Sequence, residues 1–86
     1  MHVIVVYDVP ANRTRIYRKL LRRRLEHLQY SVFFGELTRG QLTAMKNEIE
    51  DELDPADSVV IFESSNPAAF EFTTYGDTDE PGSRFT

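Results

Sequence analysis

The sequence contains no cysteine. A disulfide framework, a cysteine-based zinc site and a cysteine nucleophile are therefore excluded. A glycine-rich phosphate-binding loop and internal repeats are also absent, and no apolar run approaches the roughly 20 residues that a membrane-spanning helix needs. Met1 leads directly into an apolar, strand-like segment instead of a signal peptide. We therefore expect a soluble, cytoplasmic protein without a membrane partner.

The net charge of −4 over 86 residues hides a strong asymmetry along the chain. Residues 1–47 carry nine Lys/Arg and three acidic residues, whereas residues 48–86 carry one basic and eleven acidic residues. Seven of the ten basic residues lie between Arg13 and Arg24. Positive charge concentrated in this way is typical of a nucleic-acid-binding surface. Eight of the ten are arginine, which suits bidentate phosphate contact; a GC-rich genome or a salt-adapted surface is the alternative explanation of this bias.

The first half of the chain predicts a strand followed by an amphipathic helix. Residues 2–8 (HVIVVYD) are apolar and β-branched and are ended by Pro10. A helix capped by Asn12 is expected to run to about His27, with Arg13 inside its apolar sector. The apolar sector contains Ile16, Tyr17, Leu20, Leu21, Leu25 and Leu28. The opposite face carries Arg15, Arg18, Lys19, Arg22 and Arg23.

The second half predicts further strands and one more helix. Residues 29–37 (QYSVFFGEL) form a strand region bent or split at Gly35, either as one bent strand or as a hairpin. A capping box at Thr38 begins a helix that ends before Pro55. The apolar stripe of this helix consists of Leu42, Met45, Ile49 and Leu53. The remaining predicted segments are strands at 57–63 and 69–76 and an acidic tail at 77–86, which makes residues 1–76 a single domain.

This order of elements predicts an α+β protein of ferredoxin-like βαββαβ type, with an extra C-terminal strand. In that sandwich two helices cover one face of an antiparallel sheet. The predicted strands are nevertheless apolar on both faces, whereas a sheet that faces water on one side alternates apolar with polar residues. The second face must be covered, and a second copy of the chain is the simplest cover. We therefore expect a homodimer packed sheet to sheet.

Asp8 ends the first strand and shares its side of the strand with Ile4 and Val6. If that side is the dimer face, two copies of Asp8 approach one another and repel unless a proton or cation intervenes. Mg²⁺ or Mn²⁺ is the expected ion, since both prefer oxygen ligands and can activate water or bind a phosphate. Arg13 and Arg15 are expected to hold phosphate oxygens beside it.

A purely structural role for Asp8 is the alternative. Its carboxylate would then accept backbone amides of the turn at residues 9–12 or pair with Arg13. A lone aspartate does not decide between the two roles. An exposed aromatic platform for stacking RNA bases is not evident, because the strand aromatics fit a core.

Three segments together resemble a known family: YDVPANRTR, QYSVFFGELT and DSVVIFE. They are similar, in order over residues 2–63, to the small CRISPR-associated adaptation protein, a ferredoxin-like dimer that partners the adaptation integrase and is often described as an endoribonuclease. The segment NPAAFEFTTYG also looks like the C-terminal strand of one subgroup, which uses it in dimer and integrase contacts.

The resemblance implies roles for individual residues. The positions that match the family's proposed catalytic residues are Tyr7, Asp8, Arg13, Arg15 and Phe33. Asp8 corresponds to the aspartate proposed to bind a divalent metal between protomers. Many members carry an arginine shortly before Q-Y-S-V-F, where this chain has His27 as the nearby basic residue. The resemblance therefore implies that nuclease activity depends more strongly on pH in this chain than in members with the arginine.

Two functions follow from the resemblance, and a third stays open. The dimer is a metal-dependent endonuclease acting on RNA or DNA, or a bridge that binds a double-stranded spacer precursor and holds integrase dimers during spacer acquisition. A stand-alone, toxin-like metal-dependent ribonuclease is the alternative. The basic residues favour the bridge, because clustered cations attract any nucleic acid regardless of sequence. The expected nucleic-acid-binding residues are Arg13, Arg15, Arg18, Lys19, Arg22 and Arg23.

Overall fold

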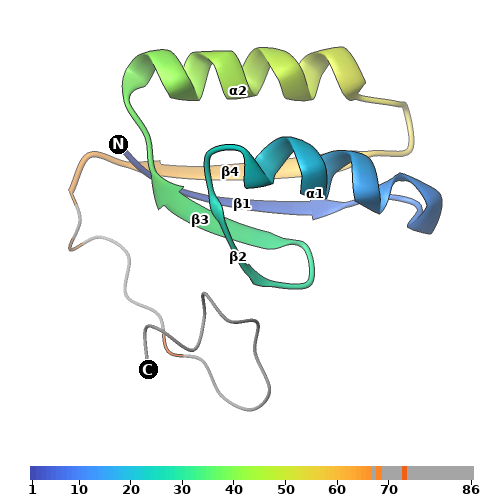
Figure 1. Ribbon diagram of the computed structural model, residues 1–86, viewed down its shortest axis with the longest axis horizontal. Coiled ribbons are helices and arrows are strands. Elements are labelled where there is room, and N and C mark those ends of the chain that lie inside the picture. The colour runs from blue at the N-terminus through green and yellow to red at the C-terminus, as the bar shows by residue number, and fades with distance from the viewer. Residues whose placement is uncertain (67, 69–72, 74–86) are drawn as a thin grey trace.

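Four antiparallel strands and two α-helices form a two-layer α+β sandwich (Figure 1). The structure is a computed structural model that describes residues 1–66, 68 and 73. The elements are β1 (His2–Asp8), the short 3-10 helix η1 (Ala11–Arg13), α1 (Thr14–Arg22), β2 (Glu26–Gln29), β3 (Val32–Glu36), α2 (Arg39–Glu52) and β4 (Ser58–Ser64). The strand order in the sheet is β2-β3-β1-β4. The predicted ferredoxin-like fold class is thus confirmed.

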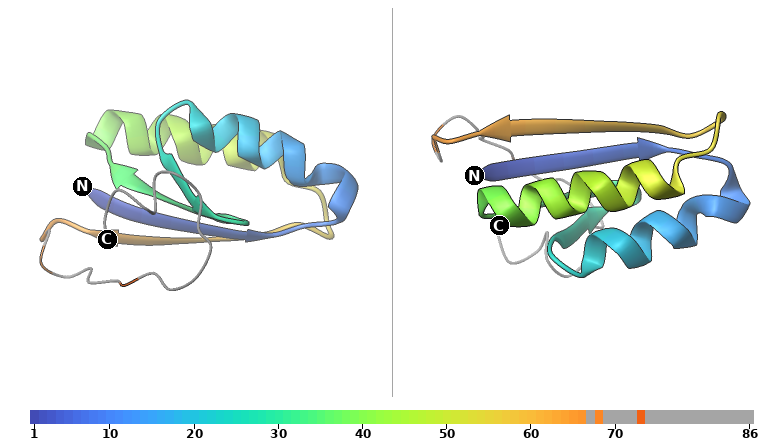
Figure 2. Two further views of the ribbon diagram at one scale, coloured as in Figure 1. Left: turned by 60° about the horizontal axis from the view of Figure 1, so that its bottom comes forward. Right: turned by 90° about the horizontal axis from the view of Figure 1, so that it is seen from above.

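Both helices cover the same face of the sheet (Figure 2). Alternate residues of β1 point into this layer, and Val3, Val5 and Tyr7 are at most 3% exposed. They pack with apolar residues of both helices and with Phe33 of β3. The buried core consists of Val3, Val5, Tyr7, Tyr17, Leu20, Leu21, Leu25, Phe33, Leu37, Leu42, Met45 and Ile49. Within the described part of the chain, no helix is long and apolar enough to cross a membrane.

The other face of the sheet is also apolar. Ile4 of β1 is paired with Phe34 on one side and with Phe62 on the other, so these three side chains share one face. Val6, paired with Val32 and Val60, extends the same surface. Val60 and Phe62 remain 47% and 51% exposed. Neither described helix lies over this surface, which we call the apolar sheet face (Ile4, Val6, Val32, Phe34, Val60 and Phe62).

Helix α1 is shorter than predicted at both ends. Asn12 lies inside η1, and the N-cap position of α1 is Arg13, which forms no side-chain capping bond. The predicted Asn12 cap is therefore wrong. The helix ends at Arg22, and the predicted end at His27 is also wrong because residues 26–29 pair with β3. Hairpin pairing with the next strand, β3, has overridden the helical pattern.

Residues 26–36 form a β-hairpin. The chain turns at Tyr30 and Ser31, between β2 and β3, and the predicted break at Gly35 is wrong. Gly35 lies inside β3 opposite Val3, and a Cβ on it would come within 2.9 Å of Leu25 Cδ2. Glycine at this position therefore makes room for the buried Leu25 side chain.

Helix α2 and strand β4 agree closely with the sequence patterns. The Thr38 hydroxyl accepts the Gln41 N–H, and the Gln41 side chain accepts the Thr38 N–H, which confirms the capping box. Leu42, Met45 and Ile49 are buried, whereas Leu53, the fourth member of the predicted stripe, follows the helix and is 48% exposed. The predicted strand at 69–76 and the predicted tail at 77–86 lie almost entirely outside the described residues.

Candidate functional site

Asp8 is exposed at the end of β1, on the same side of the strand as Ile4 and Val6. Among the described residues, none forms a hydrogen bond or an ion pair with its carboxylate. Neither structural role that the sequence allowed is observed, because the backbone amides of the following turn do not bond it and Arg13 pairs elsewhere. An exposed carboxylate without a structural partner is available to bind a ligand.

A cavity of about 240 Å³ lies beside Asp8. Three parts of the chain form it: the end of β1, the first turns of α1 and the β2–β3 turn. Its lining residues are Tyr7, Asp8, Val9, Thr14, Arg18, Tyr30 and Ser31. The Tyr7 N–H donates to the Ser31 carbonyl at 3.1 Å and holds the β2–β3 turn against β1. Figure 1 shows this turn and the end of β1 at the same end of the sheet.

Tyr7 and Phe33, two of the residues that the family resemblance pointed to, lie in the core. Tyr7 is 3% exposed, and its ring stacks on Tyr17 at 5.6 Å and on Phe33 at 6.2 Å. Phe33 is fully buried and stacks on His27 at 4.5 Å. Phe33 therefore packs in the core of the sandwich, opposite Val5 of β1.

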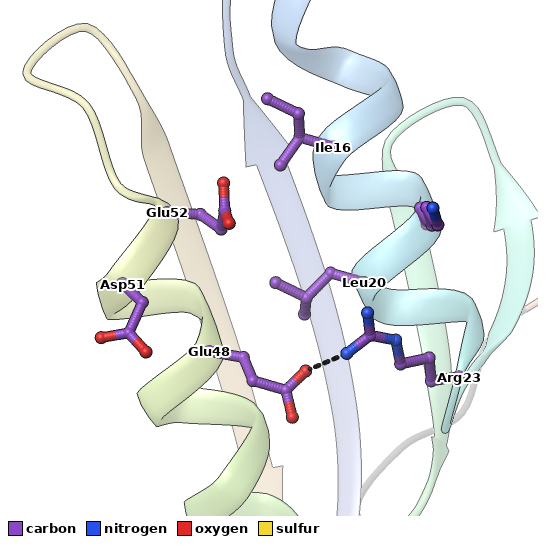
Figure 3. A pocket seen from close by; sticks show the side chains of 7 residues that line it. Ile16, Leu20, Arg23, Glu48, Asp51 and Glu52 are labelled. Atoms are coloured by element: carbon purple, nitrogen blue, oxygen red, sulfur yellow. Dashed lines mark hydrogen bonds and ion pairs between the residues drawn. The ribbon is translucent and has the colours of Figure 1, made fainter.

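Four outward-facing cations of α1 and Arg23, its C-cap residue, form an exposed surface, which we call the basic face. Arg18 joins this face to the Asp8 cavity. Arg23, at the other margin, pairs with Glu48 of α2 at 2.9 Å across a cleft of about 330 Å³ (Figure 3). The basic face consists of Arg15, Arg18, Lys19, Arg22 and Arg23, all exposed. The structure thus brings most of the predicted binding residues together and connects them with Asp8.

Arg13 is separated from the basic face. Its Nε donates to the Asp57 carboxylate at 3.0 Å, and its Nη1 lies 3.1 Å from Asp54 Oδ2. Its Nη2 donates to the Glu52 carbonyl at 2.6 Å. The guanidinium is thus surrounded by oxygen atoms of the last residue of α2 and of the loop between α2 and β4. Arg13 fastens the start of α1 to that loop, and a phosphate would have to compete with these contacts.

Asp57 is a residue that the sequence reasoning missed. Its side chain is fully buried and accepts the Tyr17 hydroxyl at 2.6 Å and the Asp54 N–H at 3.1 Å, besides Arg13. Burial would raise the pKa of Asp57, but these donors outweigh it and lower the pKa. Burial and the hydrogen bond to Asp57 raise the pKa of Tyr17. The one available signal was an aspartate placed between a turn and a strand, which does not reveal a partner 44 residues away.

His27 organises the β2–β3 turn. Its Nε2 lies against the Tyr30 carbonyl, which can only accept, and its Nδ1 lies 3.4 Å from Arg22 Nη2, which can only donate. In this arrangement Nε2 donates to the Tyr30 carbonyl and Nδ1 accepts from the Arg22 guanidinium. Stacking on Phe33 fixes the plane of the ring.

The described residues contain no group of three or more acidic or histidine side chains that could hold a metal ion. Among the described residues that line the cavity, Asp8 is the one carboxylate. Mg²⁺ in proteins is commonly held by one or two carboxylates, with substrate phosphates and water as further ligands. A single Asp8 therefore fits such an ion only if a second copy or a bound phosphate supplies the rest.

Comparison with known proteins identifies the family. The family model described as CRISPR associated protein Cas2 matches residues 1–71. A curated relative from Haloferax volcanii, named CRISPR-associated endoribonuclease Cas2, is 81% identical over 86 residues, which cover both chains completely. A relative of the same name from Thermococcus kodakarensis is 43% identical over 63 residues, which cover 72% of this chain and 74% of that one.

Two solved structures share the fold. A crystal structure of Cas2 superposes with a TM-score of 0.84 at 36% identity, covering 94% of this chain and 92% of that one. Cas2 of Streptococcus pyogenes, solved at pH 6.5, superposes with a TM-score of 0.78 at 25% identity, covering 88% of this chain and all of that one. The names of the curated relatives support the predicted enzyme class, and the predicted family is confirmed. The chain belongs to the Cas2 family of CRISPR-associated proteins.

Proposed function

We propose that this protein acts in CRISPR adaptation as a homodimer that binds double-stranded nucleic acid and bridges dimers of the adaptation integrase. The observation that supports it best is the basic face, with five exposed cations on one side of α1 and its C-cap. Such a surface binds phosphates of any sequence and loses affinity as salt rises. A spacer precursor has no fixed sequence, and binding without sequence preference suits that substrate.

A second copy of the chain is the proposed cover of the apolar sheet face. Val60 and Phe62 are about half exposed, and they continue into Ile4 and Phe34 across three paired strands. Contiguous apolar surface of this kind marks an interaction site. A two-fold dimer is self-complementary and would cover the apolar sheet faces of both copies at once. It would also bring the two Asp8 side chains to one interface, since Asp8 lies on that side of β1.

We propose phosphodiester hydrolysis at Asp8 as a second activity, on RNA or DNA. It is favoured by the exposure of Asp8, its lack of a described partner and the endoribonuclease name of the relatives. Two Asp8 carboxylates, one from each copy, would hold Mg²⁺ or Mn²⁺. When bound, this ion would supply an activated water and stabilise charge on the phosphate. Arg18, in the same cavity, would orient the phosphate.

The variant Asp8→Asn tests both activities together. We expect it to abolish metal-dependent cleavage and to leave duplex binding and spacer integration nearly unchanged, measured side by side with purified integrase. Asp51→Asn is the matched control, because it removes an exposed carboxylate from α2, away from the Asp8 cavity. Cleavage that survives in Asp8→Asn would refute the nuclease proposal. Loss of binding and integration in this variant would instead show that Asp8 belongs to the bridge.

A stand-alone, toxin-like ribonuclease is the remaining alternative. It would use Asp8 in the same chemistry but would need no integrase. Co-purification with the integrase, and integration that depends on this chain, would exclude it. Cleavage without any effect on integration would favour it over the bridge.

A further inference from the structure

Tyr30 is the most exposed large hydrophobic residue among those described, with 82% of its surface accessible. It occupies the β2–β3 turn, where its backbone φ is 43°. This left-handed conformation is uncommon for residues other than glycine, asparagine and aspartate. An aromatic ring at an exposed turn gains nothing from burial, so packing within the described chain does not explain it.

Contacts on both sides of Tyr30 hold the turn in this conformation. The His27 imidazole donates to the Tyr30 carbonyl, and His27 itself is stacked on the buried Phe33. On the other side, the Ser31 carbonyl accepts the Tyr7 N–H. The backbone of the turn is therefore anchored to the core while the ring of Tyr30 points away from it. A binding group presented on an anchored backbone loses little conformational entropy when a ligand arrives.

The surroundings of Tyr30 have the chemistry of a nucleotide site. Tyr30 lines the Asp8 cavity together with Arg18 of the basic face and the Ser31 residue of the same turn. The guanidinium suits a phosphate, and an aromatic ring suits the face of a base. Tyr30 belongs to the turn and to none of the strand positions of the apolar sheet face. A second copy that covers this face would therefore not have to cover the ring.

We propose that Tyr30 stacks on an unpaired nucleobase of the nucleotide whose phosphate is bound by Arg18. The inference rests on the proposed nucleic-acid binding and adds a subsite to it. Bases inside a duplex are already stacked on their neighbours, so the subsite would select a single strand or an unpaired end. It would place that nucleotide in the same cavity as Asp8.

Binding of short oligonucleotides tests the proposal in a two-by-two design. One ligand is a hexamer of adenosine ribonucleotides, and the other is an abasic hexamer with the same phosphates. Titrations at low salt in EDTA prevent metal-dependent cleavage. We expect the wild-type protein to bind the adenosine hexamer about tenfold more tightly than the abasic one, within the range measured for stacking on one aromatic ring. Tyr30→Asn should lose that preference and bind both ligands equally.

Two control variants separate stacking from other effects. Tyr30→Phe keeps the ring and should keep the preference. Arg18→Gln should weaken binding of both hexamers by the same factor and leave their ratio unchanged. Because asparagine tolerates a positive φ, Tyr30→Asn should unfold thermally at the wild-type temperature or above it. Blunt duplex binding should be the same in Tyr30→Asn and wild type.

Several outcomes would overturn the proposal. If Tyr30→Asn lost affinity for both hexamers equally, the ring would contact the nucleic-acid backbone or shape the site. If it lost affinity for neither hexamer, the ring would not contact the nucleic acid. A change of oligomeric state in Tyr30→Asn would assign the ring to a protein interface. If the wild-type protein bound duplex but bound the adenosine and abasic hexamers equally, the stacking proposal would fail and the proposed function would stand. If it bound no nucleic acid, the proposed function would fail with it.

Discussion

Arg18 lies where the basic face of α1 meets the Asp8 cavity, and the variant Arg18→Gln tests whether that face binds duplex phosphates. The substitution removes one positive charge and keeps a long polar side chain. Arg18 is exposed, and no described residue forms a hydrogen bond or ion pair with it, so the fold should be unaffected. The loss should therefore appear in binding and not in stability.

The size of the change in salt dependence follows from the number of basic-face cations that are not paired with a described carboxylate. Of the basic face, Arg23 is paired with a described carboxylate, Glu48, which leaves four cations per protomer for phosphates. Four contacts give a slope of about −3.6 in log affinity against log salt, so raising KCl from about 50 to about 200 mM should weaken binding about 150-fold. Arg18→Gln leaves three contacts, so the slope should become shallower, about −2.7, and the same rise in KCl should weaken binding only about 40-fold. A dimer that engages both faces would double each slope.

Arg39→Gln is the matched control for this measurement. Arg39 is also exposed and carries the same charge, but it lies in the first turn of α2, outside the basic face. Fluorescence anisotropy with a blunt duplex at four or five salt concentrations would give both slopes. We expect the slope to change in Arg18→Gln and to stay at the wild-type value in Arg39→Gln. Equal changes in the two variants would refute the basic face, because net charge alone would then explain binding.

Three further predictions concern assembly and stability. Phe62→Ser should shift the protein to monomer in light scattering, whereas Leu53→Ser, an equally exposed position off the apolar sheet face, should not; a monomeric wild type would refute the dimer. Asp57→Asn should lower the urea midpoint at pH 7 and reduce its dependence on pH. Because the folded-state pKa of Asp57 is lowered, its contribution is present above about pH 4 and is lost as the pH falls through that lowered value. Equal pH dependence in variant and wild type would contradict this role. Thr38→Ala removes the capping box of α2 and should cost about 1 kcal/mol in chemical denaturation, and no change would contradict the cap.

Local patterns in the sequence were enough for several parts of the fold. Three predictions depend on near neighbours, and each was confirmed: the strand at residues 2–8, the capping box at Thr38 and the strand at residues 57–63, which is observed as Ser58–Ser64. Apolar residues on both sides of the strands also predicted a sheet with two apolar faces.

Contacts between segments decided two features that these patterns did not reveal. Residues 23–29 have the spacing of a helix, but Glu26 and His27 pair with β3 instead, so the chain turns at Tyr30. The pairing of Arg13 with Asp57, 44 residues away, left no local signal in the sequence. Pairing between segments decided both features, within a hairpin in the first case and over 44 residues in the second.

The sequence by itself determined the strand periodicity, the charge of α1 and the carboxylate at the end of β1, because these depend on residue type and spacing alone. Only the tertiary structure decided which arginines stay free, which carboxylate is buried and which aromatic ring is exposed. Those properties depend on where segments remote in sequence meet. Arg18, Tyr30 and Asp8 come from three such segments, and their shared cavity exists only once the β2–β3 turn packs against the end of β1.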